Sequence, residues 1–416
     1  GPFWERAAPE GTANAPPDSS GEALRELQPS PELTGPPASP TTAIPGDRQE
    51  GVRREEKEEA GAVTTTTALT GGVSGGGGGS QGRGEQTHRV HEGEGMLEVR
   101  VNAGRGDFRV LIPPGQPPSR GWPLVLALHG RCQSPEQLDA SLGLSRLAVG
   151  REGRESAGAT EPFVLALPEG RRSMIFFACR VWQATEACCG EQSRALAPAS
   201  EDDAAYIGSV VRMLTSGPTV HVDPRRVSLL GSSNGGFLAN VIACTQADLA
   251  ASVATLGSST YARREDCQPS SPVRMLAVHG SRDVTVPFAG GTIPGGDFIP
   301  AWVPGADEVA ARWGAYNGCS NKPSLKTGEP LRGAGRLRMY EVEVTAYPGC
   351  EAGGASELWA VQGAQHLTQY SSVATQRVLE FLLADGGAGG REAQGGGGGE
   401  AADTEGSERA TRDNIN

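Results

Sequence analysis

Residues 226–242 read RVSLLGSSNGGFLANVI: a short apolar run, a turn bounded by glycines and a helix-like segment. The turn matches the pattern G-x-S-x-G, with Ser233 at its centre. A strand that passes through such a tight turn into a helix lifts the serine hydroxyl above the edge of a sheet, where the helix N-terminus points at it. We therefore predict that Ser233 is a nucleophile.

The same pattern occurs twice more, around Ser74 and Ser80, inside a glycine tract with no strand-like segment before it. Such tracts are typical of flexible linkers. With 60 Gly in 416 residues, the pattern is expected about once by chance. The strand–turn–helix context, and not the motif, therefore distinguishes Ser233.

The two ends of the chain differ in composition from the middle. Residues 1–95 and 386–416 are rich in glycine and in polar or charged runs. They hold too few apolar side chains to offset the chain entropy lost on ordering, and we predict two disordered tails. Residues 96–385 contain the apolar runs and all eight cysteines. We predict one large α/β domain there.

The formal net charge is −12 at pH 7. It argues against nucleic acid or an anionic membrane surface as the main partner and favours a neutral or weakly polar substrate. No apolar run is long enough to span a bilayer. The sequence lacks the C-x-x-C pairs of zinc sites, and we predict neither a metal nor a cofactor.

The cysteines indicate the redox compartment. An even number confined to the folded part predicts disulfides, and therefore an extracellular or secretory location, although no signal peptide is visible. The alternative is a set of reduced, buried cysteines in a cytosolic enzyme. Eight cysteines allow 105 pairings. They are Cys132, Cys179, Cys188, Cys189, Cys244, Cys267, Cys319 and Cys350.

Eight apolar segments are predicted as strands: 97–101, 108–112, 123–128, 163–167, 227–230, 273–278, 341–344 and 357–361. Helical patterns separate many of them, at about 135–149, 201–215, 235–246, 306–317 and 371–384. This alternation predicts a doubly wound, mostly parallel α/β sheet flanked by helices. Ligands bind such sheets beyond the carboxyl ends of the strands.

Polar residues follow these strands in an informative order. Ser233, Asp283 and His366 each come shortly after a predicted strand, and Ser…Asp…His is the order of the α/β-hydrolase arrangement. His366 alone among the six histidines follows both Ser233 and Asp283, so we predict that it is the general base. Asp283 is predicted to orient it. Three aspartates compete with Asp283 but do not directly follow a buried strand: Asp266, Asp297 and Asp307.

An oxyanion hole needs two backbone N–H donors. One is expected from Asn234, the residue after the nucleophile. The other is expected from the turn after His129-Gly130, and therefore from Arg131 or Cys132.

The segments LALHG, LPEG, VDPRRVSLLGSSNGG and PVRMLAVHGSRDVTVP, in this order, resemble the secreted polyhydroxybutyrate depolymerase and feruloyl/acetylxylan esterase group, carbohydrate esterase family 1 in the broad sense. The resemblance covers about 106–383, and 222–236 is its most specific part. Two departures fall near the expected pocket mouth. Arg131-Cys132-Gln133 replaces the usual Cys-Gly-Gly, and Leu367-Thr368 stands where Trp-Pro is frequent.

This resemblance implies that Trp182 and the segment Cys188-Cys189-Gly190 line or brace the substrate pocket; a core role for Trp182 is the alternative. It also places cysteines at Cys319 and Cys350, which bracket the strand predicted at 341–344. We predict that these two form a disulfide.

The predicted function is hydrolysis of a carboxylic ester through an acyl-enzyme. The substrate would carry feruloyl or acetyl groups on polysaccharide, or would be a polyhydroxybutyrate-type polyester. The alternative is a non-catalytic surface or wall-binding protein on a hydrolase scaffold. A peptidase of this fold is disfavoured because no repeats precede the domain.

Overall fold

The computed structural model describes residues 88–90, 95–150, 160–173, 179–188, 202–218, 220–294, 300–332, 339–366 and 370–384. All of them belong to the second of two units of the chain, Ala62–Asn416. The predicted tails lie outside these residues, apart from Gly95 and the strand β1 (His88–Val90). β1 pairs antiparallel with β2 (Leu97–Asn102). The sheet therefore starts before the predicted boundary at residue 96, because main-chain hydrogen bonds alone can add an edge strand.

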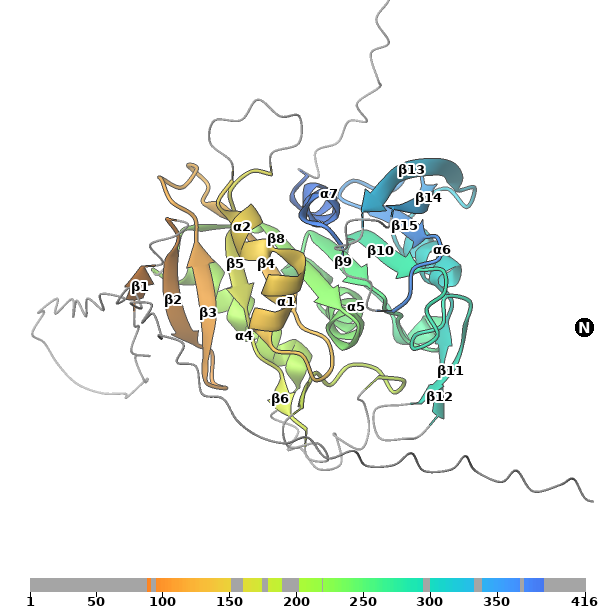
Figure 1. The fold of residues 1–416 in the computed structure, drawn as a ribbon, viewed down its shortest axis with the longest axis horizontal. Helices are drawn as coiled ribbons and strands as arrows, with labels where there is room; N and C mark the ends of the chain where they lie inside the picture. The colour runs from red at the N-terminus through yellow and green to blue at the C-terminus, as the bar shows by residue number, and fades with distance from the viewer. Residues whose placement is uncertain are drawn as a thin grey trace, which may run out of the picture. The chain divides into compact units, whose positions relative to one another are not determined.

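In the described part of the chain, one sheet of eleven strands has the order β1-β2-β3-β5-β4-β8-β9-β10-β15-β14-β13 (Figure 1). Beyond β1 and β2, its strands are β3 (Asp107–Ile112), β4 (Trp122–Leu128), β5 (Val164–Leu167), β8 (Val222–Ser232), β9 (Ser252–Leu256), β10 (Arg274–Gly280), β13 (Ser324–Arg332), β14 (Met339–Tyr347) and β15 (Ala355–Val361). Neighbours from β5 to β15 run parallel, and antiparallel strands flank them on both sides. The predicted mostly parallel sheet is confirmed.

β9 is a central strand that the sequence did not predict. Its residues, SVATL, include two small side chains and only two β-branched ones, so the local strand preference is weak. Pairing with both β8 and β10 compensates for this weakness. β9 ends level with Ser232 of β8. It therefore lies beside the turn that follows β8.

Helices cover both faces of the sheet (Figure 1). One face carries α1 (Pro135–Leu142), α2 (Leu144–Ala148) and α7 (Ser372–Leu383); the other carries α4 (Asp203–Ser216), α5 (Asn234–Thr245) and α6 (Ala306–Tyr316). Side chains of the inner strands alternate between the two apolar layers, so Leu126 faces one layer and Val125 the other. The helix predicted at 135–149 is two helices that meet at Gly143.

The C-terminus of α7 is fixed to the amino end of the sheet. The carbonyl of Leu382 accepts hydrogen bonds from the hydroxyls of Ser228 (3.1 Å) and Ser252 (2.7 Å). Arg226 and Arg274 donate to the carbonyls on either side, those of Leu383 and Phe381. These groups satisfy carbonyls that a helix end leaves unpaired, and the two cations favour the negative end of the helix dipole.

Two short hairpins lie beyond the carboxyl ends of the strands. β6 (Arg171–Arg172) pairs with β7 (Arg180–Val181) after β5. β11 (Gly290–Pro294) pairs with β12 (Pro300–Pro304) after β10. The buried side chains of the second hairpin pack against Phe237 in the first turn of α5. Both hairpins therefore flank the edge where Ser233 lies.

Three disulfides connect described residues: Cys132–Cys179, Cys244–Cys267 and Cys319–Cys350. The third joins the end of α6 to the turn after β14 and closes 31 residues that include the β13–β14 hairpin.

Replacing Cys319 and Cys350 together by serine should lower the free energy of unfolding by about 3–4 kcal/mol, because the unfolded chain regains the entropy of a loop of this length. Urea unfolding of oxidised wild type and variant measures the difference. A loss below about 1 kcal/mol would show that this loop is not constrained in the unfolded chain as the entropy argument requires.

Candidate active site

Ser233 occupies a strained turn between β8 and α5. Its φ is +49° and its ψ −116°, a conformation that costs a non-glycine residue about 1–3 kcal/mol. Its N–H donates to the carbonyl of Leu256 at the end of β9, at 2.8 Å. A Cβ on Gly235 would lie 2.1 Å from the carbonyl oxygen of Leu128. Glycine at this position therefore lets α5 begin directly against the end of β4 and hold the turn in place.

The side chains of Ser233, His366 and Asp283 form a hydrogen-bonded series. Ser233 Oγ lies 2.9 Å from His366 Nε2, and His366 Nδ1 lies 2.7 Å from Asp283 Oδ2. A carboxylate only accepts hydrogen bonds, so Nδ1 carries the imidazole proton and Nε2 is left to accept the serine proton. The structure thus brings together the three residues that the sequence singled out, from three different strand ends.

The loop that carries His366 is bound to the turn after β10. The N–H of Arg282 donates to the carbonyl of Ala364 at 2.9 Å. The N–H of Gly363 donates to the hydroxyl of Ser281 at 2.8 Å. These two bonds fix the loop of the base relative to the turn of the acid.

Asp283 is almost fully buried, and its carboxylate accepts three hydrogen bonds and faces the imidazole of His279. Oδ1 accepts the N–H groups of Thr285 and Val286, both at 2.9 Å. Oδ2 accepts from His366 at 2.7 Å and lies 3.3 Å from Nε2 of His279. Burial by itself raises the pKa of Asp283, but the polar contacts with His279, His366 and Val286 outweigh it and hold the pKa well below its usual range. The carboxylate is therefore ionised at neutral pH.

Two residues support this series without having been predicted to do so. His279 Nε2 lies 2.9 Å from the carbonyl of Val286, so it carries a proton and also faces Asp283. Gly257, after β9, has a φ of +58°, and a Cβ there would lie 3.0 Å from the carbonyl of His366. The spacing of His279 and Asp283 was a usable signal, whereas Gly257 was hidden because β9 itself was not recognised.

The two predicted oxyanion donors in the turn after β4 differ in their bonds. The N–H of Cys132 donates to the carbonyl of Arg180 at 2.8 Å. That N–H is already bonded inside the protein, and Arg131 stays a predicted donor. Asn234, the other predicted donor, is the first residue of α5, where backbone N–H groups lie at the positive end of the helix dipole.

Trp182 was predicted to line or brace the substrate pocket, and the structure excludes lining. Its side chain has no exposed surface. It packs on the imidazole of His129 and its indole N–H donates to the carbonyl of that residue at 2.9 Å. The apolar ring and its single donor are both satisfied inside the protein, as in the core alternative. Cys188 contacts the amide of Asn234 at 3.2 Å; Cys189 and Gly190 lie outside the described residues.

No family model matches the chain. Two curated relatives do: "Putative esterase NocK" of Nocardia uniformis subsp. tsuyamanensis, 26% identical over 61% of this chain and 64% of the relative, and "Feruloyl esterase B" of Piromyces equi, 24% identical over 66% of this chain and 45% of the relative. The chain therefore spans less than two thirds of the length of either. Among solved structures, an acetyl xylan esterase from Aspergillus awamori matches 72% of this chain and 99% of its own, with 15% identity and a TM-score of 0.44.

Ser233, Asp283 and His366 follow the ends of parallel strands, in the order expected for the α/β-hydrolase fold. Both curated relatives are named esterases, which agrees with this arrangement. The chain has the α/β-hydrolase fold. The predicted resemblance to an esterase group of this fold is confirmed.

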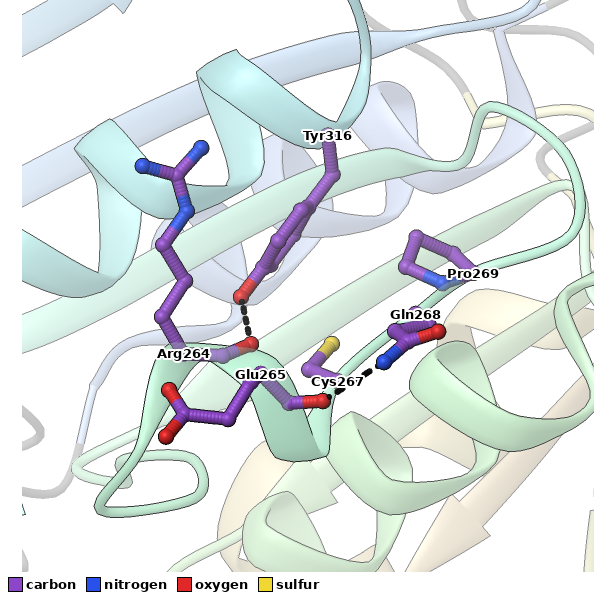
Figure 2. A pocket seen from close by; sticks show the side chains of 6 residues that line it. All are labelled: Arg264, Glu265, Cys267, Gln268, Pro269 and Tyr316. Carbon is purple, nitrogen blue, oxygen red and sulfur yellow. Dashed lines mark hydrogen bonds between the residues drawn. The ribbon is translucent and has the colours of Figure 1, made fainter.

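An open pocket of about 440 Å³ lies at the end of α5 that is remote from Ser233 (Figure 2). It is lined by Arg264, Glu265, Cys267, Gln268, Pro269 and Tyr316. Cys267 is disulfide-bonded to Cys244. Cys244 lies eleven residues after Ser233, about 16 Å along α5. Figure 2 shows the Tyr316 hydroxyl donating to the carbonyl of Arg264 and the Gln268 amide donating to that of Glu265. Its lining residues include no pair of the kind that Ser233 and His366 form.

The described residues include no group of three His, Cys, Asp or Glu side chains that could hold a metal ion. None of the helices within those residues is long and apolar enough to cross a membrane.

His129, at the end of β4, is fully buried and neutral. Its Nε2 accepts the N–H of Gly170 at 2.9 Å, and its Nδ1 lies 2.8 Å from the carbonyl of Gly130. Burial lowers the pKa of His129 from 6.5 to about 4. The unfolded chain binds this proton at a higher pH than the folded protein does, so acid favours unfolding.

Lowering the pH from 6.5 to 4 should therefore cost up to about 3 kcal/mol of stability through His129 alone. Asp283 does not oppose this loss, because a lowered carboxylate pKa removes stability only at still lower pH. Urea unfolding at pH 7 and pH 4.5 measures the slope, and His129→Gln should flatten it. Equal slopes for the two proteins would contradict a neutral, buried His129.

Proposed function

We propose that this α/β-hydrolase is a serine carboxylic-ester hydrolase that acts through an acyl-enzyme. The observation that carries the proposal is the series of hydrogen bonds from Ser233 through His366 to Asp283, at 2.9 and 2.7 Å. These distances are those that a nucleophile, a general base and an orienting acid require. The names of both curated relatives support an ester as the substrate.

In the first half of the reaction, Ser233 Oγ attacks the ester carbonyl while His366 Nε2 takes its proton. Asp283 is ionised and bonded to Nδ1, so it stabilises the imidazolium that forms. The negative charge on the tetrahedral intermediate is stabilised by the N–H groups of Asn234 and Arg131. The imidazolium then returns the proton to the alcohol as it leaves, and an acyl-serine remains.

In the second half, water takes the place of the alcohol. His366 Nε2 accepts a proton from that water as its oxygen attacks the acyl carbonyl. The second tetrahedral intermediate uses the same two donors as the first. Its collapse releases the carboxylic acid and returns the proton to Ser233.

We propose feruloyl or acetyl esters of polysaccharide as the substrate, with polyhydroxybutyrate-type polyester as the second candidate. The name of the Piromyces equi relative supports the first. A net charge of −12 favours a neutral substrate and disfavours nucleic acid as a partner. The three disulfides support an oxidising, extracellular or secretory location.

Ser233→Ala should lower kcat by about 10³-fold or more while the fold survives, because only the attacking oxygen is lost. Ser232→Ala is the matched control. It removes the neighbouring hydroxyl, which is largely buried, and should leave kcat within about threefold of wild type. Hydrolysis of a 4-nitrophenyl ester measures both, and equal losses would place the nucleophile elsewhere.

Feruloylated or acetylated xylan oligomers should be hydrolysed with a kcat/KM at least about tenfold above that of hydroxybutyrate oligomers, since tenfold is about 1.4 kcal/mol of preference in the transition state. A reversed order would assign the polyester. A fluorophosphonate probe tests for the alternative wall-binding protein. Failure to label Ser233 in wild type, together with no hydrolysis of any ester, would favour that alternative.

A further inference from the structure

Trp182 is the first residue after β7 and makes three hydrogen bonds to two separate parts of the site. Its main-chain N–H donates to Oδ1 of Asn234 at 2.7 Å, and its carbonyl accepts from Nδ2 of Asn234 at 2.8 Å. Its indole N–H donates to the carbonyl of His129 at 2.9 Å. Its ring centroid lies 4.9 Å from that of the His129 imidazole.

These two partners belong to the two arms of the proposed oxyanion hole. Asn234 follows Ser233 and supplies one donor. His129 directly precedes Gly130 and Arg131, the turn that supplies the other. Trp182, fully buried, thus bonds to both of the segments that supply the proposed N–H donors, and the separation of these donors must match a single oxygen atom.

The segment that carries Trp182 is itself fixed at both sides. The N–H of Gln183 donates to Oδ2 of Asp203, a buried carboxylate that also pairs with Arg171 at 3.3 Å. On the other side, the carbonyl of Arg180 accepts the N–H of Cys132 at 2.8 Å. Trp182 therefore lies in a segment that is fixed on both sides, and its bonds attach Asn234 and His129 to that segment.

We propose that Trp182 is a positioning residue that sets the distance between the two oxyanion donors. The proposal rests on the proposed function, since it concerns an oxyanion. It follows from the bonds of Trp182 to both arms together with its complete burial, which excludes contact with substrate. Donors act at full strength only within about 0.5 Å of their productive positions.

The test is Trp182→Phe, which removes the indole N–H and leaves the bonds to Asn234. We expect kcat to fall by about 10- to 100-fold, less than the 10²- to 10³-fold caused by losing a donor outright. KM should stay within about threefold, because the ground-state ester makes little use of the hole. The affinity for a trifluoromethyl ketone, which forms a tetrahedral adduct on serine, should weaken in parallel with kcat/KM.

Trp313→Phe is the matched control. Trp313 in α6 is also fully buried and its indole N–H donates to Oδ1 of Asn240 at 3.0 Å. Both variants lose one buried indole hydrogen bond and should lose similar amounts of thermal stability. Only Trp182→Phe should lower kcat.

A second replacement keeps the test decisive if Trp182→Phe does not fold. β-(3-Benzothienyl)alanine at position 182 retains the shape of the indole and lacks only its N–H, and the same fall in kcat is expected. Equal kcat values for the position 182 and position 313 variants in an active wild-type background would overturn the positioning role and leave the esterase standing. An inactive wild type would instead overturn the proposed function.

Discussion

The parallel register of β8, β9, β10 and β15 is the constraint on which the site depends. Ser232 pairs with Leu256, Leu256 pairs with Val278, and Val278 pairs with Trp359. The four strands therefore end close to one level, and their following loops meet at one edge. A shift of a single residue in one strand would turn its side chains to the opposite face and move its loop by about 3.3 Å. Hydrogen bonds as short as 2.7 Å between side chains of different loops leave no room for such a shift.

The polar groups under the site are buried and paired. Asp283 accepts three hydrogen bonds and faces His279, burial keeps His129 neutral, and Asp203 accepts from Gln183 and pairs with arginines. Removing one partner from such a network leaves a desolvated group without compensation, which costs more than the bond itself contributes. The network thus favours one arrangement of the loops over near alternatives, which is what preorganised donors and a preoriented base require.

Two buried asparagine side chains perform the same structural task at opposite edges of the sheet. Asn234 bonds both the N–H and the carbonyl of Trp182, and Asn317 bonds both the N–H and the carbonyl of Val273. A side-chain amide offers one acceptor and two donors in a plane, so it can replace a strand neighbour for a single residue. Asn317 fixes Val273, the residue before β10. Asn234 instead fixes Trp182, which belongs to no strand or helix. The first is explained by folding alone; the second also connects parts of the site.

The sequence by itself determined the alternation of strands and helices, the order Ser233, Asp283, His366 and the edge on which they would meet. These follow from local patterns: continuous apolar runs, helical periodicity and the residue that directly follows each strand. Only the tertiary structure decided the rest. β9 is a strand because its neighbours pair with it, Gly257 is needed because the carbonyl of His366 approaches it, and Trp182 is buried because Asn234 and His129 hold it. Such features depend on contacts between residues 22 to more than 100 positions apart, which local preference does not encode.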